Sequence, residues 1–184
     1  MTPDRSSSPP APAAAIPPDD PGRHAAVARP DGDDALPHVA VAGNTYTILL
    51  SGEQTAGRYC LVDMHVAPDG GPPPHRHDFE ESFTVLDGEI EVTFRGERSV
   101  VRAGETVHVP ANAPHSFTNR SGRHARLLCI CAPAGQERFF LEVGDRVATR
   151  TTPPPSLDDA TRAARRETAR TLAPQYRTEM LPPA

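Results

Sequence analysis

The sequence lacks several residue types, and each absence narrows what the protein can be. Tryptophan and lysine do not occur, aromatic residues make up 5% of the 184 positions, and all 19 basic residues are therefore arginines. We interpret this all-arginine composition as the codon bias of a GC-rich, bacterial genome. The net charge of −5 is mild, and no stretch gathers the arginines into a basic stripe, so we expect no nucleic acid partner.

Long apolar runs and frequent cysteines are absent as well. No run is long enough to span a bilayer, so we expect no membrane partner. Residues 1–15 are rich in Ser, Pro and Ala and lack the apolar core of a signal peptide. The cysteines Cys60, Cys129 and Cys131 are too few and odd in number for a disulfide framework. Reduced thiols fit a cytosol, so we expect a soluble cytoplasmic protein.

Proline, in contrast, is abundant, with 22 residues. The segment 1–37 is rich in Pro, Ala, Asp and Gly and shows no hydrophobic periodicity, which predicts a disordered tail. A docking or dimerising role for the apolar residues 39–41 is the alternative to flexibility at the end of this tail.

Short β-branched and apolar segments separated by turns follow from residue 44. Many short strands at regular spacing are typical of an all-β sandwich or barrel, which we place over residues 38–150. The Asp87-Gly88 pair is a strong signal for a hairpin with a primed turn. The expected strands cover residues 45–50, 58–66, 81–86, 89–95, 99–101, 106–109, 115–118 and 125–131.

After residue 133 the pattern changes from strand to helix. Residues 136–143 predict a short helix that ends at Gly144. Three consecutive prolines form a stiff linker, and Ser156 is a suitable N-cap for a helix that runs to about residue 172. Because the apolar face of this helix is weak, we expect residues 151–184 to form a linker and a helix packed outside the barrel.

A histidine-rich stretch in the middle of the chain carries the chemistry. In a regular strand, residues two apart point to the same face, so His75, His77 and Glu81 share one face with Phe83. Glu80 has the opposite parity and should point away. One face therefore offers two imidazoles and a carboxylate, as a metal site inside a small barrel requires.

Two spaced motifs resemble those of the cupin superfamily. The first, G-x5-H-x-H-x3-4-E-x6-G, is matched by His75, His77, Glu81 and Gly88, although its leading glycine is displaced. The resemblance covers residues 45 to 133 and places the second motif fifteen residues beyond the first.

The second motif, G-x5-P-x-G-x2-H-x3-N, is matched by Gly104, Pro110, His115 and Asn119. Asn112 replaces its internal glycine, which is a mild departure because asparagine tolerates positive φ.

The resemblance implies a double-stranded β-helix, or jelly roll, with His75, His77, Glu81 and His115 as the ligands of one divalent transition metal per chain. Imidazoles and a carboxylate suit Fe, Mn, Co, Ni, Cu or Zn, and the lack of thiolates in the set argues against a closed structural zinc site. The alternative is that these are satisfied barrel histidines that hold no metal.

Several apolar residues are candidates for the wall of a substrate pocket, although each is equally well a core residue. Buried cysteines usually behave as small hydrophobic residues, so we expect no thiol chemistry. The candidates are Met64, Phe83, Phe94, Phe117, Cys129 and Cys131.

Within the superfamily, the sequence segments around the motifs resemble those of quercetin 2,3-dioxygenase-like proteins. This implies an enol or phenol substrate, of flavonol type, that is deprotonated by Glu81 and reacts with dioxygen at the metal. An isomerase, cyclase or decarboxylase of secondary metabolism that uses the metal as a Lewis acid is the alternative. A metal-dependent small-molecule sensor is a third reading. We also expect a homodimer, because exposed sheet edges invite pairing.

Overall fold

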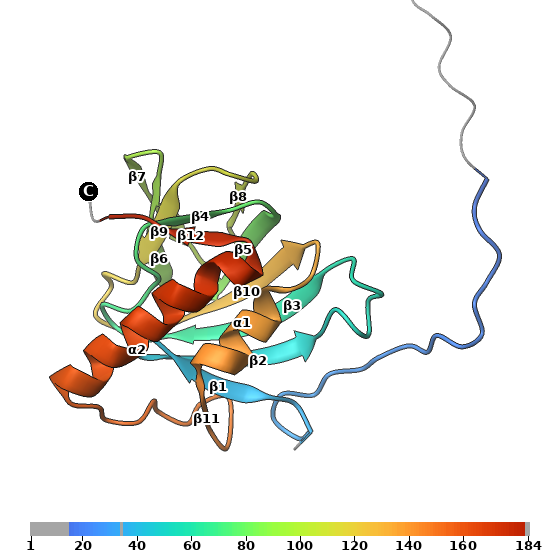
Figure 1. The fold of residues 1–184 in the computed structure, drawn as a ribbon, viewed down its shortest axis with the longest axis horizontal. Helices are drawn as coiled ribbons and strands as arrows, with labels where there is room; N and C mark the ends of the chain where they lie inside the picture. Colours follow the sequence, from blue (N-terminus) through green and yellow to red (C-terminus); the bar gives the residue numbers. More distant parts are fainter. Residues whose placement is uncertain (1–14, 34, 183–184) are drawn as a thin grey trace, which may run out of the picture.

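The computed structural model describes residues 15–33 and 35–182, and over these residues the strands form two sheets around one hydrophobic core (Figure 1). The predicted jelly roll is confirmed. The larger sheet has the strand order β11-β1-β2-β3-β10-β5-β8. Its strands are β1 (His38–Val41), β2 (Asn44–Leu50), β3 (Cys60–Val66), β5 (Glu80–Asp87), β8 (Thr106–Val109), β10 (Ala125–Ala132) and β11 (Asp145–Arg146).

The smaller sheet has the order β12-β4-β9-β6-β7 and is antiparallel at each described pairing. Alternation along β5 directs every second side chain inward, as in Phe83 and Val85, which are at most 2% exposed. The strands of the smaller sheet are β4 (His75–His77), β6 (Glu89–Phe94), β7 (Glu97–Arg102), β9 (His115–Thr118) and β12 (Thr178–Met180).

The histidine-rich stretch does not form one strand, contrary to the premise of the parity argument. The chain bends at Asp78 and Phe79, so that β4 belongs to the smaller sheet and β5 to the larger one. His77 and Glu81 still face the same interior because the two sheets face each other. His75, His77 and Glu81 therefore point inward as predicted, but the reason is the facing of two sheets and not the two-residue period of one strand.

The hairpin predicted at Asp87-Gly88 is wrong, because β5 and β6 lie in different sheets and do not pair. Gly88 has φ +76, and an added Cβ would meet the backbone of Ala125 at 3.1 Å, so glycine is needed for a crossing between sheets. The true two-residue hairpin joins β6 to β7 at Arg95 and Gly96, both with positive φ.

The beginning of the chain is only partly described, and residues 1–14 of the predicted tail lie outside the described residues. Residues 15–33 contain no helix or strand and run outside the barrel (Figure 1). The docking role considered for residues 39–41 is wrong. They belong to β1, which pairs with β2 and β11, and Val39 is completely buried.

Two helices follow the barrel strands. The first, α1 (Gln136–Val143), has the predicted bounds and inserts Phe139 and Phe140 into the core. The second, α2 (Asp159–Leu172), packs outside with no buried residue (Figure 1). The predicted N-cap Ser156 is wrong: Asp158 fills that position, and its carboxylate accepts a hydrogen bond from the Thr161 backbone N–H at 2.7 Å.

The last strand was not expected from the sequence. After α2 and the 3₁₀ turn η1 (Ala173–Tyr176), β12 pairs antiparallel with β4, so that Thr178 lies opposite His77 and Met180 opposite His75. The end of the chain thus supplies the edge strand beside two histidines. In the part of the chain that is described, neither helix combines the length and apolar character needed to cross a membrane.

Candidate metal centre

Four polar side chains from three strands meet inside the barrel, where they could hold a metal ion. His75 and His77 come from β4, His115 from β9 and Glu81 from β5. Each is at most 6% exposed. Because His75 and His115 are register partners on adjacent strands, their rings lie 4.2 Å apart between centroids, and Glu81 approaches from the opposite sheet.

Backbone carbonyls fix the orientation of all three imidazoles. The Nδ1 atom of His75 lies 2.9 Å from the Pro73 carbonyl oxygen, and His77 and His115 repeat this contact at 2.9 Å with the second residue after and before them, respectively. A carbonyl oxygen only accepts, so each Nδ1 is the protonated nitrogen and donates. In the neutral ring, the Nε2 lone pair is then free for a metal ion, as in histidine ligands generally.

The carboxylate of Glu81 completes this arrangement. Its Oε2 lies 3.1 Å from Nε2 of His77 and 3.2 Å from Nε2 of His115. With Nδ1 protonated, two neutral imidazoles would direct lone pairs at a carboxylate oxygen, which is repulsive. The contact becomes favourable when a cation, either a proton on Nε2 or a metal ion, lies between these acceptors.

Burial and neighbouring charge shift the pKa values of this site. Burial, followed by repulsion from His115, lowers the pKa of His75 to about 4, so its ring is neutral near pH 7. Burial raises the pKa of Glu81, but its contacts with His115 and His77 outweigh burial and hold the pKa below the ordinary value. A neutral ring and an ionised carboxylate are the protonation states in which metal ligands bind.

The spacing of the donor atoms fits a transition metal. With metal–nitrogen and metal–oxygen bonds of about 2.1 Å, neighbouring donors lie about 3.0 Å apart at right angles and about 3.4 Å apart in a tetrahedron. The observed separations of 3.1 and 3.2 Å lie within this interval. Three imidazoles and one carboxylate suit several divalent ions, so the donor set fits a metal without naming it.

The second motif positions the loop around the site. Asn112 has φ +67, as expected for the residue that replaces the motif glycine, and its backbone N–H donates to the His77 carbonyl at 2.6 Å. Asn119 is fully buried and donates to the carbonyl oxygens of Val66 and Arg123, which secures the chain after His115.

Two thiols adjoin the carboxylate of Glu81, a contact that the sequence did not predict. Cys129 and Cys131 on β10 are fully buried, and their Sγ atoms lie 3.4 and 3.5 Å from Oε1 of Glu81. Burial, the largest effect, raises the pKa of the Cys129 thiol to about 12. Their common strand face was visible in the sequence. Their place opposite Glu81 depends on the pairing of β5 with β10, which a sequence period does not specify.

Other side chains singled out in the sequence fall outside the cluster. Glu80 lies on the outer face, as its parity predicts, and pairs with His108 at 3.0 Å on the surface. The predicted pocket wall stays a prediction. Its members lie in the core or pack against it: Met64, Phe83, Phe117, Cys129 and Cys131 are buried, and Phe94 is partly buried.

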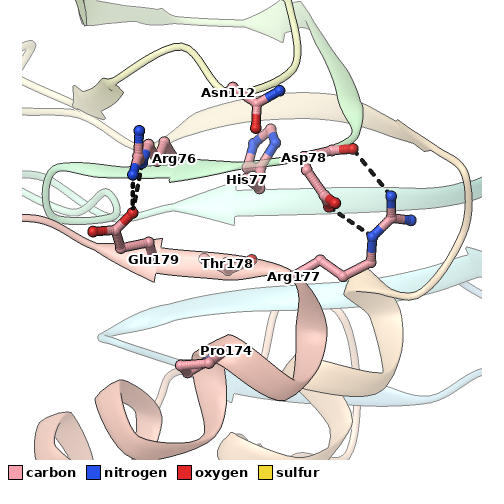
Figure 2. A pocket seen from close by; sticks show the side chains of 8 residues that line it. All are labelled: Arg76, His77, Asp78, Asn112, Pro174, Arg177, Thr178 and Glu179. Atoms are coloured by element: carbon pink, nitrogen blue, oxygen red, sulfur yellow. Dashed lines mark hydrogen bonds and ion pairs between the residues drawn. The ribbon is translucent and has the colours of Figure 1, made fainter.

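A cleft of about 450 Å³ is lined in part by His77, and by none of the other three candidate ligands. Figure 2 shows the two ion pairs of its charged wall: Arg76 pairs with Glu179 at 2.5 Å and Arg177 with Asp78 at 2.6 Å. The cleft is lined by Arg76, His77, Asp78, Asn112, Pro174, Arg177, Thr178 and Glu179. Strand β12 and the turn before it therefore form one side of this cleft.

Known proteins resemble part of this chain. The family described as Cupin domain matches residues 62–131. A quercetin 2,3-dioxygenase from Bacillus subtilis (strain 168) is 29% identical over 100 residues, which are 54% of this chain and 29% of that protein. The HTH-type transcriptional regulator PuuR from Escherichia coli (strain K12) is 36% identical over 58 residues, 32% of this chain and 31% of that protein. The chain spans less than a third of the length of these two curated relatives.

Among solved structures, a predicted oxalate decarboxylase from Thermotoga maritima has a TM-score of 0.51 and 19% identity. The match covers 58% of this chain and 98% of that one. At this identity the likeness establishes the fold alone. Together with the family match, it confirms the resemblance to cupins that the two motifs predict.

Proposed function

Because this chain resembles the cupins and gathers three imidazoles and one carboxylate inside its barrel, we propose that it is a metal-dependent enzyme for a small oxygenated metabolite. The reaction we propose is dioxygenation of an enol or phenol of flavonol type. The proposed ligands are His75, His77, Glu81 and His115, and the metal, when bound, supplies Lewis acidity and a place for oxygen ligands.

One observation carries the proposal: every Nδ1 donates to a backbone carbonyl, and the Nε2 atoms of His77 and His115 meet a carboxylate that contacts no arginine among its described partners. A cation between this carboxylate and the imidazoles, either a proton on Nε2 or a bound metal ion, makes the contact favourable. An arrangement built only for stability would pair the carboxylate with a fixed cation.

Glu81 is the proposed general base. Its carboxylate is ionised near neutral pH because its contacts with His115 and His77 outweigh the effect of burial on its pKa. A substrate hydroxyl placed beside Oε2 would give its proton to this group, which assists proton transfer by about 10²–10⁴-fold in enzymes of this kind. The surrounding apolar side chains, among them Phe79 stacked on His77 at 3.8 Å, would keep water away from the activated substrate.

The choice of dioxygenation rests on sequence likeness. The quercetin 2,3-dioxygenase relative is 29% identical over 100 residues, which are 54% of this chain. A substrate would enter through the cleft at His77, whose volume of about 450 Å³ lies within the range of small-molecule sites. The small-molecule substrate, the homodimer, the cytoplasmic location and a place in secondary metabolism stay predictions.

Oxygen consumption tests the reaction. Metal-loaded protein is mixed with a flavonol, and oxygen uptake is followed together with substrate loss. We expect uptake that matches substrate loss one to one, and no turnover without oxygen. Equal turnover under anaerobic conditions would instead assign a Lewis-acid isomerase, cyclase or decarboxylase, and a ligand that binds but is recovered unchanged would assign a sensor.

A further inference from the structure

The two thiols beside Glu81 form a cluster of their own that the proposed reaction does not use. The Sγ atoms of Cys129 and Cys131 lie 3.7 Å apart, and Oε1 of Glu81 is 3.4 and 3.5 Å from them. All three side chains are buried, and their donor atoms lie within 4.8 Å of one another.

These separations match those of ligands on one tetrahedral ion. With metal–sulfur bonds of about 2.3 Å and metal–oxygen bonds of about 2.1 Å, a tetrahedral angle places two sulfurs about 3.8 Å apart and a sulfur and an oxygen about 3.6 Å apart. Each of the three observed distances agrees with these values to within about 0.2 Å. The strand geometry of β10 produces the sulfur pair, because residues two apart point to the same side.

The two carboxylate oxygens of Glu81 serve different neighbours. Oε2 faces the Nε2 atoms of His77 and His115, and Oε1 faces the two sulfurs. Two clusters of different chemical softness are thus joined by one carboxylate. Imidazoles bind most first-row divalent ions, whereas thiolates select thiophilic ions such as zinc, copper(I) and cadmium.

We propose that Cys129, Cys131 and Oε1 of Glu81 form a second metal site, selective for a thiophilic ion, and that Glu81 bridges it to the histidine site. Binding replaces two S–H bonds by two metal–sulfur bonds and releases two protons. The chain then holds up to two ions, one on each side of the Glu81 carboxylate. This inference goes beyond the proposed reaction and does not depend on its substrate.

Cadmium alone is the probe, added to the metal-free full-length chain. The number of bound ions is measured by elemental analysis after desalting, and thiolate binding is measured by the ultraviolet charge-transfer band of a cadmium–sulfur bond. We expect two ions per chain and a thiolate band. The double variant Cys129→Ser/Cys131→Ser should bind one ion and show no band.

Cys60→Ser is the matched control, because Cys60 is a third buried thiol that pairs with Cys131 across the sheet and contacts its thiol, yet lies outside the group of donor atoms around Glu81. It should keep the band. The variant His75→Ala/His115→Ala should also keep it while binding one ion, which separates the thiol site from the histidine site.

The wild-type spectrum decides the matter even if a variant does not fold. Cadmium bound without a thiolate band would overturn the proposal. So would a single bound ion that shows the band, because one ion would then use both clusters, or a band that persists in the Cys129→Ser/Cys131→Ser variant. Two bound ions with an intact thiol band but no oxygen uptake would instead count against the proposed function alone.

Discussion

Two buried carboxylates of the larger sheet, Glu81 on β5 and Asp63 on β3, have opposite electrostatic surroundings. Asp63 is completely buried, and its carboxylate accepts two hydrogen bonds from the guanidinium of Arg126, at 2.9 and 2.8 Å, and one from Arg150 at 3.3 Å. Glu81 is 4% exposed and faces imidazole nitrogens and thiols. One carboxylate is neutralised by side chains of the chain, and the other is not.

This difference separates a structural site from a functional one. The Asp63 cluster ties β3 to β10 and, through the ion pair of Arg150 with Asp31 at 2.5 Å, to the segment that precedes the barrel. Its cations are permanent, so nothing has to bind. Glu81 contacts no arginine among its described partners, and an exchangeable cation is therefore proposed to complete the site.

The largest effect is expected from removing the charge of Glu81. Glu81→Gln keeps the shape of the side chain but not the base, so the oxygen-uptake rate should fall by about 10²–10⁴-fold, and metal content should fall as well. Glu80→Gln is the matched control one residue away. Because Glu80 lies on the surface with His108, it should change activity and stability little. Equal losses of activity and metal in both variants would show that the inward position of Glu81 and the surface position of Glu80 make no functional difference.

Acid should destabilise the metal-free protein through His75. Its pKa is about 4 when folded and 6.5 ordinarily, so the unfolded chain binds the extra proton between these values. Stability is therefore complete above about pH 6.5 and falls as the pH decreases to about 4, by about 3 kcal/mol. Glu81, whose folded pKa is lowered, adds to this loss at still lower pH.

Urea unfolding in a chelator between pH 4 and 7.5 measures this dependence, and His75→Gln should flatten it. A free energy of unfolding that is constant over this interval would show that His75 keeps its ordinary pKa in the folded protein.

Breaking the structural carboxylate should affect stability and spare the metal. Asp63→Asn leaves Arg126 and Arg150 without a buried counter-charge, and breaking a buried pair costs about 3–5 kcal/mol. We expect about 2–3 kcal/mol, because the Arg126 side chain is 34% exposed and can regain water. Metal content should not change.

Asp31→Asn, at a carboxylate that is 72% exposed, should cost at most about 1 kcal/mol and serves as the control in urea unfolding. Loss of metal from the Asp63→Asn variant would mean that the two carboxylates are not independent.

The smallest effect is expected at the wall of the cleft. Glu179→Gln removes an ion pair with Arg76 whose side chains are about half exposed, which should cost at most about 1 kcal/mol. Thermal unfolding and metal analysis should both stay close to wild type. A large loss of metal would show that the edge strand β12 positions His75 and His77 through this pair. The Glu179–Arg76 ion pair would then belong to the metal site as well.

The sequence predicts much of this molecule, because its motifs have fixed spacing. The bounds of α1, the surface position of Glu80 and the positive φ of Asn112 all follow from local patterns. The convergence of His115 with His75 followed from the resemblance of the two motifs to cupins. Strand period alone would not have brought together residues that lie 40 positions apart.

What the sequence does not predict depends on long-range pairing. The contact between Cys131 and Glu81 arises from the register of β10 with β5, and the strand at Thr178 forms because β4 offers a free edge. The ion pairs of Asp63 could not be predicted, because a single aspartate within an apolar strand does not show which arginines will contact it. The Asp87-Gly88 pair has the chemistry of a hairpin, but the chain uses it to cross between sheets.

The central claim is that His75, His77, Glu81 and His115 together hold a transition metal ion. Elemental analysis of the purified wild-type protein and of His115→Ala, prepared side by side, tests it most directly. The account predicts a transition metal in the wild type and one ion fewer per chain in the variant, with the fold retained by circular dichroism. A wild type without transition metal even after incubation with divalent ions, or a folded variant with undiminished content, would contradict it.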